Sequence, residues 1–353
     1  MDASTLTPSV PVSQDGGPPT GATDGLRCRH DRPALAWPVP AGRETVLGVI
    51  CHGGAQDEPR AAPEPLWPPH PVAERWQVRG PVRQGWWGSV RYCSNGAWVF
   101  GTACADDRAP GGMEAAAWRA YADLFTVLER EGCTHLQRLW NYLPDIHGLD
   151  DGLERYRRFN LGRARAFAEA GRGLGEGAPA ACAMGTRTGA LTVHFLAGRQ
   201  PARTIENPRQ VSAYHYPPRY GPCSPTFSRA ALADLGGGLR VLFISGTASI
   251  VGHESVHLGD VAAQTAECLR NIDAVLGAAR QHLVRSWSLE VLRERLECTV
   301  YVRRPTDLDL VRSVVTAHLG ATTPAAQAAI YLRADVCRAE LLVEIEAQVA
   351  LDG

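Results

Sequence analysis

The chain has 353 residues, with 36 basic and 37 acidic side chains and a formal net charge of −1. Its length suffices for two domains with a core each, and its charge balance gives no electrostatic reason to expect nucleic acid or an anionic membrane as a partner. All 36 basic residues are arginine. This excludes a Schiff-base or phosphate-loop lysine and leaves the forked guanidinium, which suits carboxylates, as the permanent cation.

The N-terminal part and the cysteines indicate which segment is predicted to be disordered and in which cellular compartment the protein is expected. Residues 1–40 begin with a stretch rich in Pro, Gly, Ser and Thr, which predicts a disordered tail. Strands are expected near 43–51, 75–80 and 86–93, with the proline-rich residues 52–72 as an irregular surface segment. The ten cysteines show no C-x-x-C spacing, and no leader-like or membrane-spanning apolar run is present. We therefore expect reduced thiols in a cytoplasmic protein.

The remainder of the chain contains one α+β unit twice. Each copy reads as a strand, a helix, a strand, a helix and a final pair of strands, and FGTA in the first strand of one copy corresponds to SGTA in the other. The ranges are 96–107, 117–132, 136–146, 153–171 and 182–198 in the first copy, and 241–252, 260–279, 296–304, 307–320 and 329–349 in the second. This pattern predicts duplicated domains, 41–200 and 201–353, with helices on one face of each sheet.

Residues 199–229, between the copies, are rich in Tyr, Arg and Pro. The prolines argue against a regular helix or a central strand throughout this segment. Two interpretations stay open. The segment is either an interdomain connection whose polar groups meet water, or an ordered stretch that presents Tyr and Arg side chains to a site.

Residues 253–257 read HESVH, which matches the zinc motif H-E-x-x-H. Gly252 and Gly259 flank the motif, and Asp260 has the position of an N-cap for a helix that starts later. We therefore expect a loop and no metal here. The preceding SGTASIVG (245–252) lacks the lysine of a phosphate loop and the G-x-S-x-G elbow, so tight packing or anion binding by its amides is favoured over nucleotide binding.

The C-terminal stretch 329–349 predicts two apolar strands joined by a short polar turn, which together would form a hairpin. In the second strand Glu344 and Glu346 share one face, and a tight turn would place Cys337 roughly opposite Glu344. A carboxyl in an apolar strand either pairs or stays protonated, and a protonated carboxyl in a pocket is a general acid. The alternative is an edge-strand glutamate that faces water. The last strand of the first copy, ALTVHFLAG, has no carboxylate, so the chemistry is expected in the second copy.

Several of these motifs resemble known families. The strand–turn–strand that ends in E-I-E (344–346) resembles the RidA (YjgF) fold. The stretches 206–230, 242–264 and 334–347, with RLWNYLPDIH and RRFNLGRARAF in the first half, resemble the chorismatase family over roughly residues 80–350. This resemblance implies an α+β protein with two RidA-like (chorismate-mutase-like) domains, each a mixed β-sheet with helices on one face, of which the first lacks the catalytic glutamate.

The resemblance also implies an activity, which is the conversion of chorismate with loss of its enolpyruvyl group as pyruvate, in secondary metabolism. Glu344 would be the catalytic acid, without metal or organic cofactor, and the segment 201–230 would line the site. Cys337 resembles the residue of the 3-hydroxybenzoate type, whereas Ala248 departs from that type. We expect 3-hydroxybenzoate as the product, with hydrolysis to trans-3,4-dihydroxycyclohexa-1,5-diene carboxylate as the alternative. The residues expected to bind substrate are Arg163, Tyr214, Arg219, Arg338, Gly246 and Thr247.

Two other functions stay open. One is an imine or enamine deaminase of the RidA type, with an arginine of the C-terminal stretch for the substrate carboxylate and a water near Glu344. The other is a non-catalytic ligand-binding protein on the same fold. The duplication and the Tyr- and Arg-rich segment favour a larger substrate in a single site. We expect a monomer, because an internal pair of modules covers part of the surface that single RidA modules bury in trimers.

Overall fold

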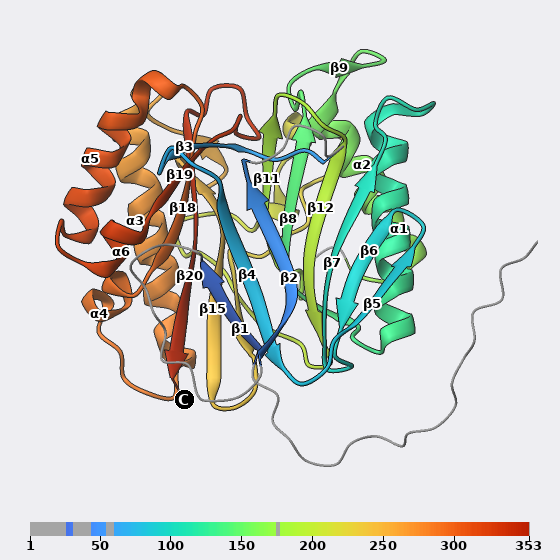
Figure 1. The fold of residues 1–353 in the computed structure, drawn as a ribbon. Helices are drawn as coiled ribbons and strands as arrows, with labels where there is room; N and C mark the ends of the chain where they lie inside the picture. The colour runs from blue at the N-terminus through green and yellow to red at the C-terminus, as the bar shows by residue number, and fades with distance from the viewer. Residues whose placement is uncertain (1–25, 31–43, 54–59, 174–176, 353) are drawn as a thin grey trace, which may run out of the picture.

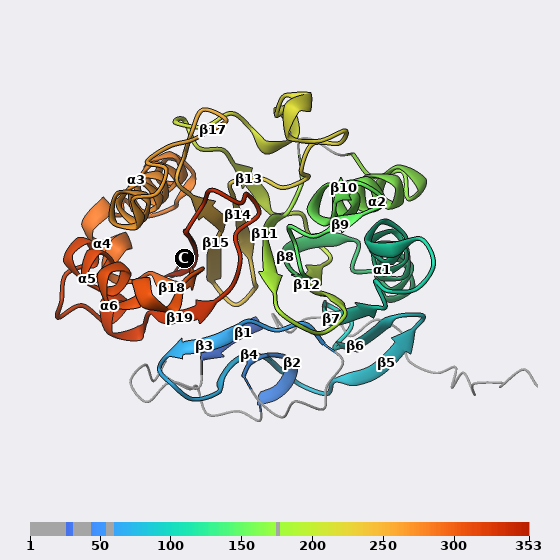
Figure 2. The same ribbon diagram turned by 90° about the horizontal axis from the view of Figure 1, so that it is seen from above.

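The computed structural model describes residues 26–30, 44–53, 60–173 and 177–352. Two β-sheets face each other in the middle of the molecule, and each carries its helices on the outer side (Figures 1 and 2). A small third sheet lies along one side of this pair, as Figure 2 shows from above. The predicted α+β class, with two modules that each carry helices on one face of a mixed sheet, is confirmed.

The first module is a six-stranded sheet in the order β11-β8-β12-β7-β6-β5. Helices α1 and α2 pack closely because Gly162 has no side chain, and a Cβ there would lie 2.0 Å from the Glu114 carbonyl oxygen. The elements are β5 (Arg83–Trp87), β6 (Val90–Ser94), β7 (Trp98–Ala105), α1 (Gly112–Glu131), β8 (His135–Pro144), β9 (Leu149–Asp150), β10 (Leu153–Glu154), α2 (Arg155–Glu169), β11 (Ala180–Thr186) and β12 (Leu191–Gly198).

The second module is a seven-stranded sheet in the order β13-β14-β15-β20-β18-β19-β3. The Asp260 carboxylate caps α3 by accepting a hydrogen bond from the Ala263 amide at 2.9 Å, as the sequence predicted. The elements are β13 (Arg203–Ile205), β14 (Ala230–Asp234), β15 (Leu239–Ala248), β16 (Ile250–Val251), β17 (Glu254–Ser255), α3 (Val261–Ala279), α4 (Leu289–Glu294), β18 (Glu297–Val302), α5 (Leu308–Leu319), α6 (Pro324–Ala328), β19 (Ile330–Arg333) and β20 (Val343–Asp352).

The two modules share one strand topology. In the first, β11 is parallel to β8, and β12 runs antiparallel between β8 and β7. In the second, β19 is parallel to β18, and β20 runs antiparallel between β18 and β15. The predicted C-terminal hairpin is therefore wrong, because β18 separates β19 from β20. The connection 334–342 is long enough to cross over the end of β18 and is not a tight turn.

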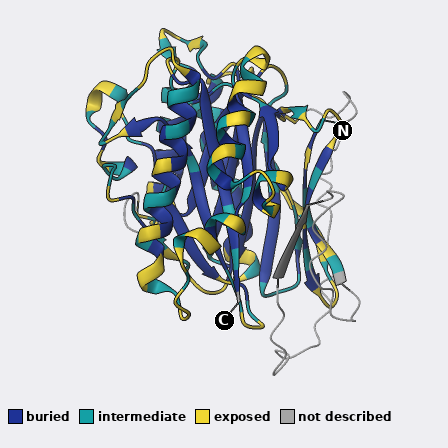
Figure 3. Ribbon diagram, turned by 90° about the vertical axis from the view of Figure 1, so that its left-hand side faces the viewer, coloured by how far each residue is buried: buried dark blue, intermediate teal, exposed yellow. Residues whose placement is uncertain are grey.

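The sheets bury residues on both faces, so their strands read as almost continuous apolar runs. One hydrophobic cluster lies under α3 and α5, a second lies under α1 and α2, and a third fills the space between the two sheets. Trp76, Trp140 and Phe243 are the large side chains of that third cluster. Figure 3 shows the buried strands at the centre and the exposed residues on the outer turns and loops.

The N-terminal part departs from the predicted boundaries. Strands β1 (Leu26–His30), β4 (Val72–Arg79) and β2 (Glu44–His52) form the third sheet in that order, so the predicted tail 1–40 is ordered at β1. Residues 1–25 and 31–43 lie outside the described residues. Strand β3 (Glu64–Trp67), inside the expected irregular segment, pairs with β19 and belongs to the second module. The prediction of an irregular segment was wrong at β3, because β3 is an edge strand and an edge strand tolerates proline.

Within the described residues, no helix is both long and apolar enough to cross a bilayer.

Candidate active site

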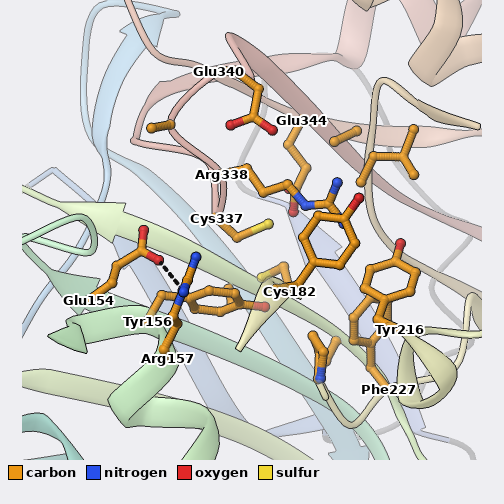
Figure 4. A pocket seen from close by; sticks show the side chains of 18 of the residues that line it. Glu154, Tyr156, Arg157, Cys182, Tyr216, Phe227, Cys337, Arg338, Glu340 and Glu344 are labelled. Atoms are coloured by element: carbon orange, nitrogen blue, oxygen red, sulfur yellow. Dashed lines mark hydrogen bonds and ion pairs between the residues drawn. The ribbon is translucent and has the colours of Figure 1, made fainter. Parts of the chain in front are cut away.

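A cavity of about 380 Å³ lies where the two modules meet the segment 201–230. Its walls come from α2 and β11 of the first module, from β15 and β20 of the second, and from the stretch 337–340 that precedes β20. Figure 4 shows Arg338, Cys337 and Cys182 grouped around the side chain of Glu344. The two copies of the repeat therefore build one shared cavity.

Glu344 lies on β20, is 4% exposed and faces the cavity. Its carboxyl occupies the space over Gly246, where an added Cβ would lie 1.9 Å from Glu344 Oε1. Burial first, and the neighbouring Glu346 second, raise the pKa of Glu344 from 4.5 to about 8, against the opposing effect of Arg138 and Arg229. The carboxyl therefore keeps its proton at neutral pH and can act as a general acid.

Three buried or partly buried arginines line this cavity. Arg163 comes from α2, Arg229 directly precedes β14, and Arg338 follows Cys337. Among the described residues, Arg163 Nε, Arg229 Nε and Arg338 Nη2 are buried and have no hydrogen-bond partner. Buried charged donors without partners are costly. Their convergence on one cavity therefore suits a ligand with carboxylates.

Each of these arginines is held in place by its other nitrogens. Arg163 Nη2 donates to Asn160 Oδ1 at 2.9 Å, and Arg229 Nη2 donates to the Tyr216 hydroxyl at 2.8 Å. Arg338 Nη1 donates to the His253 carbonyl oxygen at 3.0 Å, and its guanidinium lies 3.9 Å from the centroid of the Tyr220 ring. The free donors are thus pre-oriented, which lowers the entropy lost when a ligand binds.

Small side chains surround the Glu344 carboxyl. Ala248 is its register partner on β15, and both Cys337 and Cys182 line the cavity. Burial and the nearby Glu344 raise the pKa of Cys337 to about 12, and burial raises the pKa of Cys182 well above its usual value. Both sulfurs are therefore thiols at neutral pH and suit packing better than nucleophilic attack.

The cavity contains Glu344, Cys337, Ala248, Arg163, Arg219, Arg338 and Gly246 of the predicted site. Tyr214 and Thr247 do not line it, which corrects two predicted substrate-binding residues. Tyr214 sits in a 3₁₀ turn, Ala213–His215, with its ring against His215. Thr247 follows Gly246 on β15 and points to the opposite face, where its hydroxyl donates to the Ser245 carbonyl oxygen.

Reasoning from the sequence missed Tyr216, Tyr220, Phe227, Arg229 and Cys182, all of which line the cavity. The first four belong to the segment 201–230, whose interpretation as a lining of the site agrees with their positions. Because this segment consists of turns, its sequence has no helical or strand periodicity that would predict which residues face inward. Cys182 carried no signal in the sequence beyond its place at the start of a predicted strand.

The HESVH motif of residues 253–257 is not helical, as predicted. Glu254 and Ser255 form the short strand β17, and Glu254 pairs with Arg219 at 2.9 Å. His257 lies 3.4 Å from Glu267. No group of three or more His, Cys, Asp or Glu in the described part of the chain is arranged to hold a metal ion.

The duplicated fold and the cavity with one protonated acid and several arginines define a two-module protein built for an anionic small molecule. The family model described as "Chorismatase FkbO/Hyg5-like, N-terminal" matches residues 74–197. A chorismatase of Streptomyces hygroscopicus is 38% identical over 92% of this chain and 94% of its own. A 3-hydroxybenzoate synthase of the same organism is 39% identical over 79% of this chain and 82% of its own.

A solved structure supports the same relationship. The crystal structure of a chorismatase at 1.08 Å resolution superimposes with a TM-score of 0.78 at 34% sequence identity, and covers 94% of this chain and 100% of that chain. This protein belongs to the chorismatase family.

Proposed function

We propose that this protein converts chorismate to 3-hydroxybenzoate and pyruvate, with Glu344 as the acid. The observation that carries the proposal is the buried, protonated Glu344 in a cavity with three unpartnered arginine donors. Chorismate has two carboxylates and an acid-labile enol ether, which match those two features. The similarity to proteins named chorismatase and 3-hydroxybenzoate synthase supports the same substrate.

The arginines and the aromatic side chains that line the cavity would bind the substrate. Arg163, Arg229 and Arg338, which line the cavity, would hold the two carboxylates through charge-assisted hydrogen bonds. Tyr220 and Phe227, which also line the cavity, give the ring a flat apolar surface. These contacts would hold the enol ether at a fixed place next to the acid, which supplies the orientation part of catalysis.

The chemical step begins with proton transfer. Glu344 gives its proton to the terminal methylene carbon of the enolpyruvyl group, so that a C–H bond forms from the electron pair of the C=C bond. The ether carbon becomes an oxocarbenium-like cation, and the Glu344 carboxylate left behind stabilises this charge. Pyruvate leaves when one of the two bonds of the ether oxygen breaks. If water adds to the cation, the bond between the cationic carbon and the ether oxygen breaks. If an oxygen of the substrate displaces pyruvate from the ring, the bond between the ring and the ether oxygen breaks.

The product depends on which oxygen adds. Water would give the dihydrodiol, in which the ether oxygen stays on the ring and takes up a proton, while the oxygen of that water becomes the keto oxygen of pyruvate. An oxygen of the substrate itself leads to 3-hydroxybenzoate, which together with pyruvate has the same atoms as chorismate. Cys337 lines the cavity near Glu344 and would limit the room for water, whereas Ala248, the register partner of Glu344, is small and departs from the 3-hydroxybenzoate type. The thiol is larger and less polar than a small hydroxylated side chain, which favours the route without water.

The first experiment is to incubate the pure protein with chorismate, measure pyruvate by coupling to lactate dehydrogenase and identify the organic acid by its mass. Release of pyruvate with 3-hydroxybenzoate is expected, and the dihydrodiol as sole organic acid would establish hydrolysis instead. Binding of chorismate without pyruvate release would establish the non-catalytic alternative. A dehydroalanine-imine assay on the same sample tests the deaminase alternative. We also propose a monomer, which light scattering after gel filtration tests directly.

A further inference from the structure

A second buried carboxyl lies close to Glu344. Glu346 follows two residues later on β20, faces the same way and is 5% exposed. Its oxygens are fully used, because Arg138 Nη2 donates to Oε2 at 2.5 Å and the Tyr301 hydroxyl donates to Oε1 at 3.0 Å. By contrast, none of the described residues donates a hydrogen bond to the Glu344 carboxyl or forms an ion pair with it.

Arg138 comes from the other module. It lies on β8, is 2% exposed and reaches across to the second sheet. Its Nη1 donates to the Ile244 carbonyl oxygen at 3.1 Å, directly before the bulge of β15 that carries Gly246. The Cys182 thiol, which lines the cavity, also hydrogen-bonds to Glu346. The pair Arg138–Glu346 is thus fixed behind the cavity wall, on the far side of Cys182 from the substrate space.

The number of buried charges decides which carboxyl carries the proton. Two carboxyls about 7 Å apart along one strand cannot both be ionised in a low-dielectric interior with one paired cation. Of the two carboxyls, only Glu346 pairs with Arg138. Burial raises the pKa of Glu346, but the charge of Arg138 and the hydrogen bond from Tyr301 oppose this effect, whereas Glu344 has no such partner among the described residues. Glu346 is therefore the carboxylate and Glu344 is the acid. We propose that Arg138 and Glu346 form a positioning pair that holds the proton on Glu344 by keeping a permanent negative charge beside it.

This inference rests on the proposed function, because the proton matters only if it is transferred to a substrate. The other groups that face Glu344 act less specifically. The cavity arginines favour its ionised form, but bound carboxylates of the substrate would neutralise them, whereas Glu346 is present throughout. The titratable or charged groups around Glu344 are Cys182, Arg138, Arg163, Tyr156, Arg229, Arg338, Cys337, Glu340, Cys268, Tyr301 and Glu346.

The test is the alkaline limb of the pH profile of kcat/KM, which reports the acid in the free enzyme. Glu346→Gln removes the negative charge and leaves Arg138 positive, so the limb is expected to move to lower pH by about 1 to 2 units. Arg138→Met removes the positive charge, so its limb should stay in place or move to higher pH. The double variant lacks both charges and should return the limb close to its original position.

A purely structural role gives a different result. Both single variants leave a buried charge unpaired and would lose stability, but their alkaline limbs would coincide with that of the unchanged protein. That coincidence would overturn the proposal. Asp273→Asn is the control, because the half-buried Asp273 also pairs with an arginine, Arg293 at 2.6 Å, but lies on α3 outside the cavity. It should lower stability and leave the limb unmoved.

Infrared difference spectra of the protein against Glu344→Gln follow the proton without turnover. The band of a protonated carboxyl is expected to persist through neutral pH and to vanish at lower pH in Glu346→Gln. If the band is absent from the unchanged protein at pH 6, the inference fails whatever the activity. If the band behaves as expected but no pyruvate is released from chorismate, the proposed function fails and the electrostatic role stands. The double variant also gives a folded sample if one of the single variants does not fold.

Discussion

The two modules have the same topology, but the corresponding tetrapeptides FGTA in β7 and SGTA in β15 present opposite faces. In β7, Gly101 pairs with Phe195 on the helix side, and Thr102 pairs with His194 on the side between the sheets. In β15 a bulge at Ser245 and Gly246 inverts this order. Gly246 therefore faces the cavity, while Thr247 pairs with Ile345 on the helix side.

The extra residue in β15 is thus the structural difference that gives the second module a cavity-facing glycine. The bulge sets two residues of β15 opposite Glu346 alone and opens the space that the Glu344 carboxyl occupies. The corresponding strand of the first module, β12, presents the buried His194, whose pKa is lowered to about 3 by burial, by His52 and by Arg60. The inner face of β12 is therefore neutral, and the first module contributes its chemistry through the cations Arg138 and Arg163.

The largest expected effect is the loss of the acid. Glu344→Gln keeps the shape of the side chain but has no proton to transfer, so kcat should fall by about a thousandfold or more. Pyruvate release measured in the coupled assay checks this value, and circular dichroism checks the fold. A variant with a tenth of the original activity would refute Glu344 as the acid.

The contribution of the first module is tested at two arginines of one helix. Arg163 is 2% exposed and faces the cavity, whereas Arg165 is exposed and pairs with Glu169 at 2.8 Å. Arg163→Gln should raise KM by about a hundredfold, because a buried, charge-assisted contact to a carboxylate is lost. Arg165→Gln is the control and should leave the kinetics unchanged. Equal effects of the two substitutions would contradict the assignment.

The glycines of the two tetrapeptides face opposite sides of their sheets, so replacing each by alanine should affect activity in one case and stability in the other. In Gly246→Ala the new methyl group would collide with the Glu344 carboxyl, so kcat should fall by about tenfold to a hundredfold with little loss of stability. In Gly101→Ala the methyl group meets the Phe195 ring at 2.3 Å, so the free energy of unfolding should fall by about 1–3 kcal/mol with kcat retained. Thermal denaturation and initial rates on both variants distinguish the two faces.

The smallest effect concerns stability and pH. The pKa of Glu344 is raised from 4.5 to about 8 in the folded chain, so the native state binds a proton that the unfolded state releases. Stability from this group is therefore complete below pH 4.5 and is lost as the pH rises towards 8. Glu344→Gln should be more stable than the unchanged protein by about 2–3 kcal/mol at pH 7, with no difference at pH 4. Urea unfolding at the two pH values measures this, and an equal difference at both would contradict the raised pKa.

Much of the fold followed from local pattern, because helices and strands of the repeat keep their periods in both copies. Asp260 as a cap and the absence of a helix at HESVH were also predicted correctly, since glycine and capping signals act within a few residues, but the short strand β17 inside the motif was not expected. The hairpin prediction failed because pairing between β19 and β20 is decided by β18, which lies more than 25 residues earlier in the chain. Local pattern has no information about such an insertion.

The site was predictable where a side chain's direction follows from regular strand alternation, as for Glu344. It was not predictable across the bulge, because the bulge turns Thr247 to the opposite face of the strand. It was also not predictable in the turns of the segment 201–230, where Tyr216 lines the cavity and Tyr214 does not. Arg138 was invisible as a partner of Glu346 because the two residues are 208 positions apart. Contacts between modules depend on packing of whole sheets, which no short motif encodes.

The edge strand β3 has a consequence for the solubility of shortened chains. It covers the outer rim of β19, and with it one end of the seven-stranded sheet. A strand without a neighbour exposes a row of amide and carbonyl groups that recruits strands from other molecules. A chain that begins near residue 80 would retain every residue of the cavity, yet it would have an open sheet edge and tend to aggregate. Strand β3 therefore protects the second module against self-association.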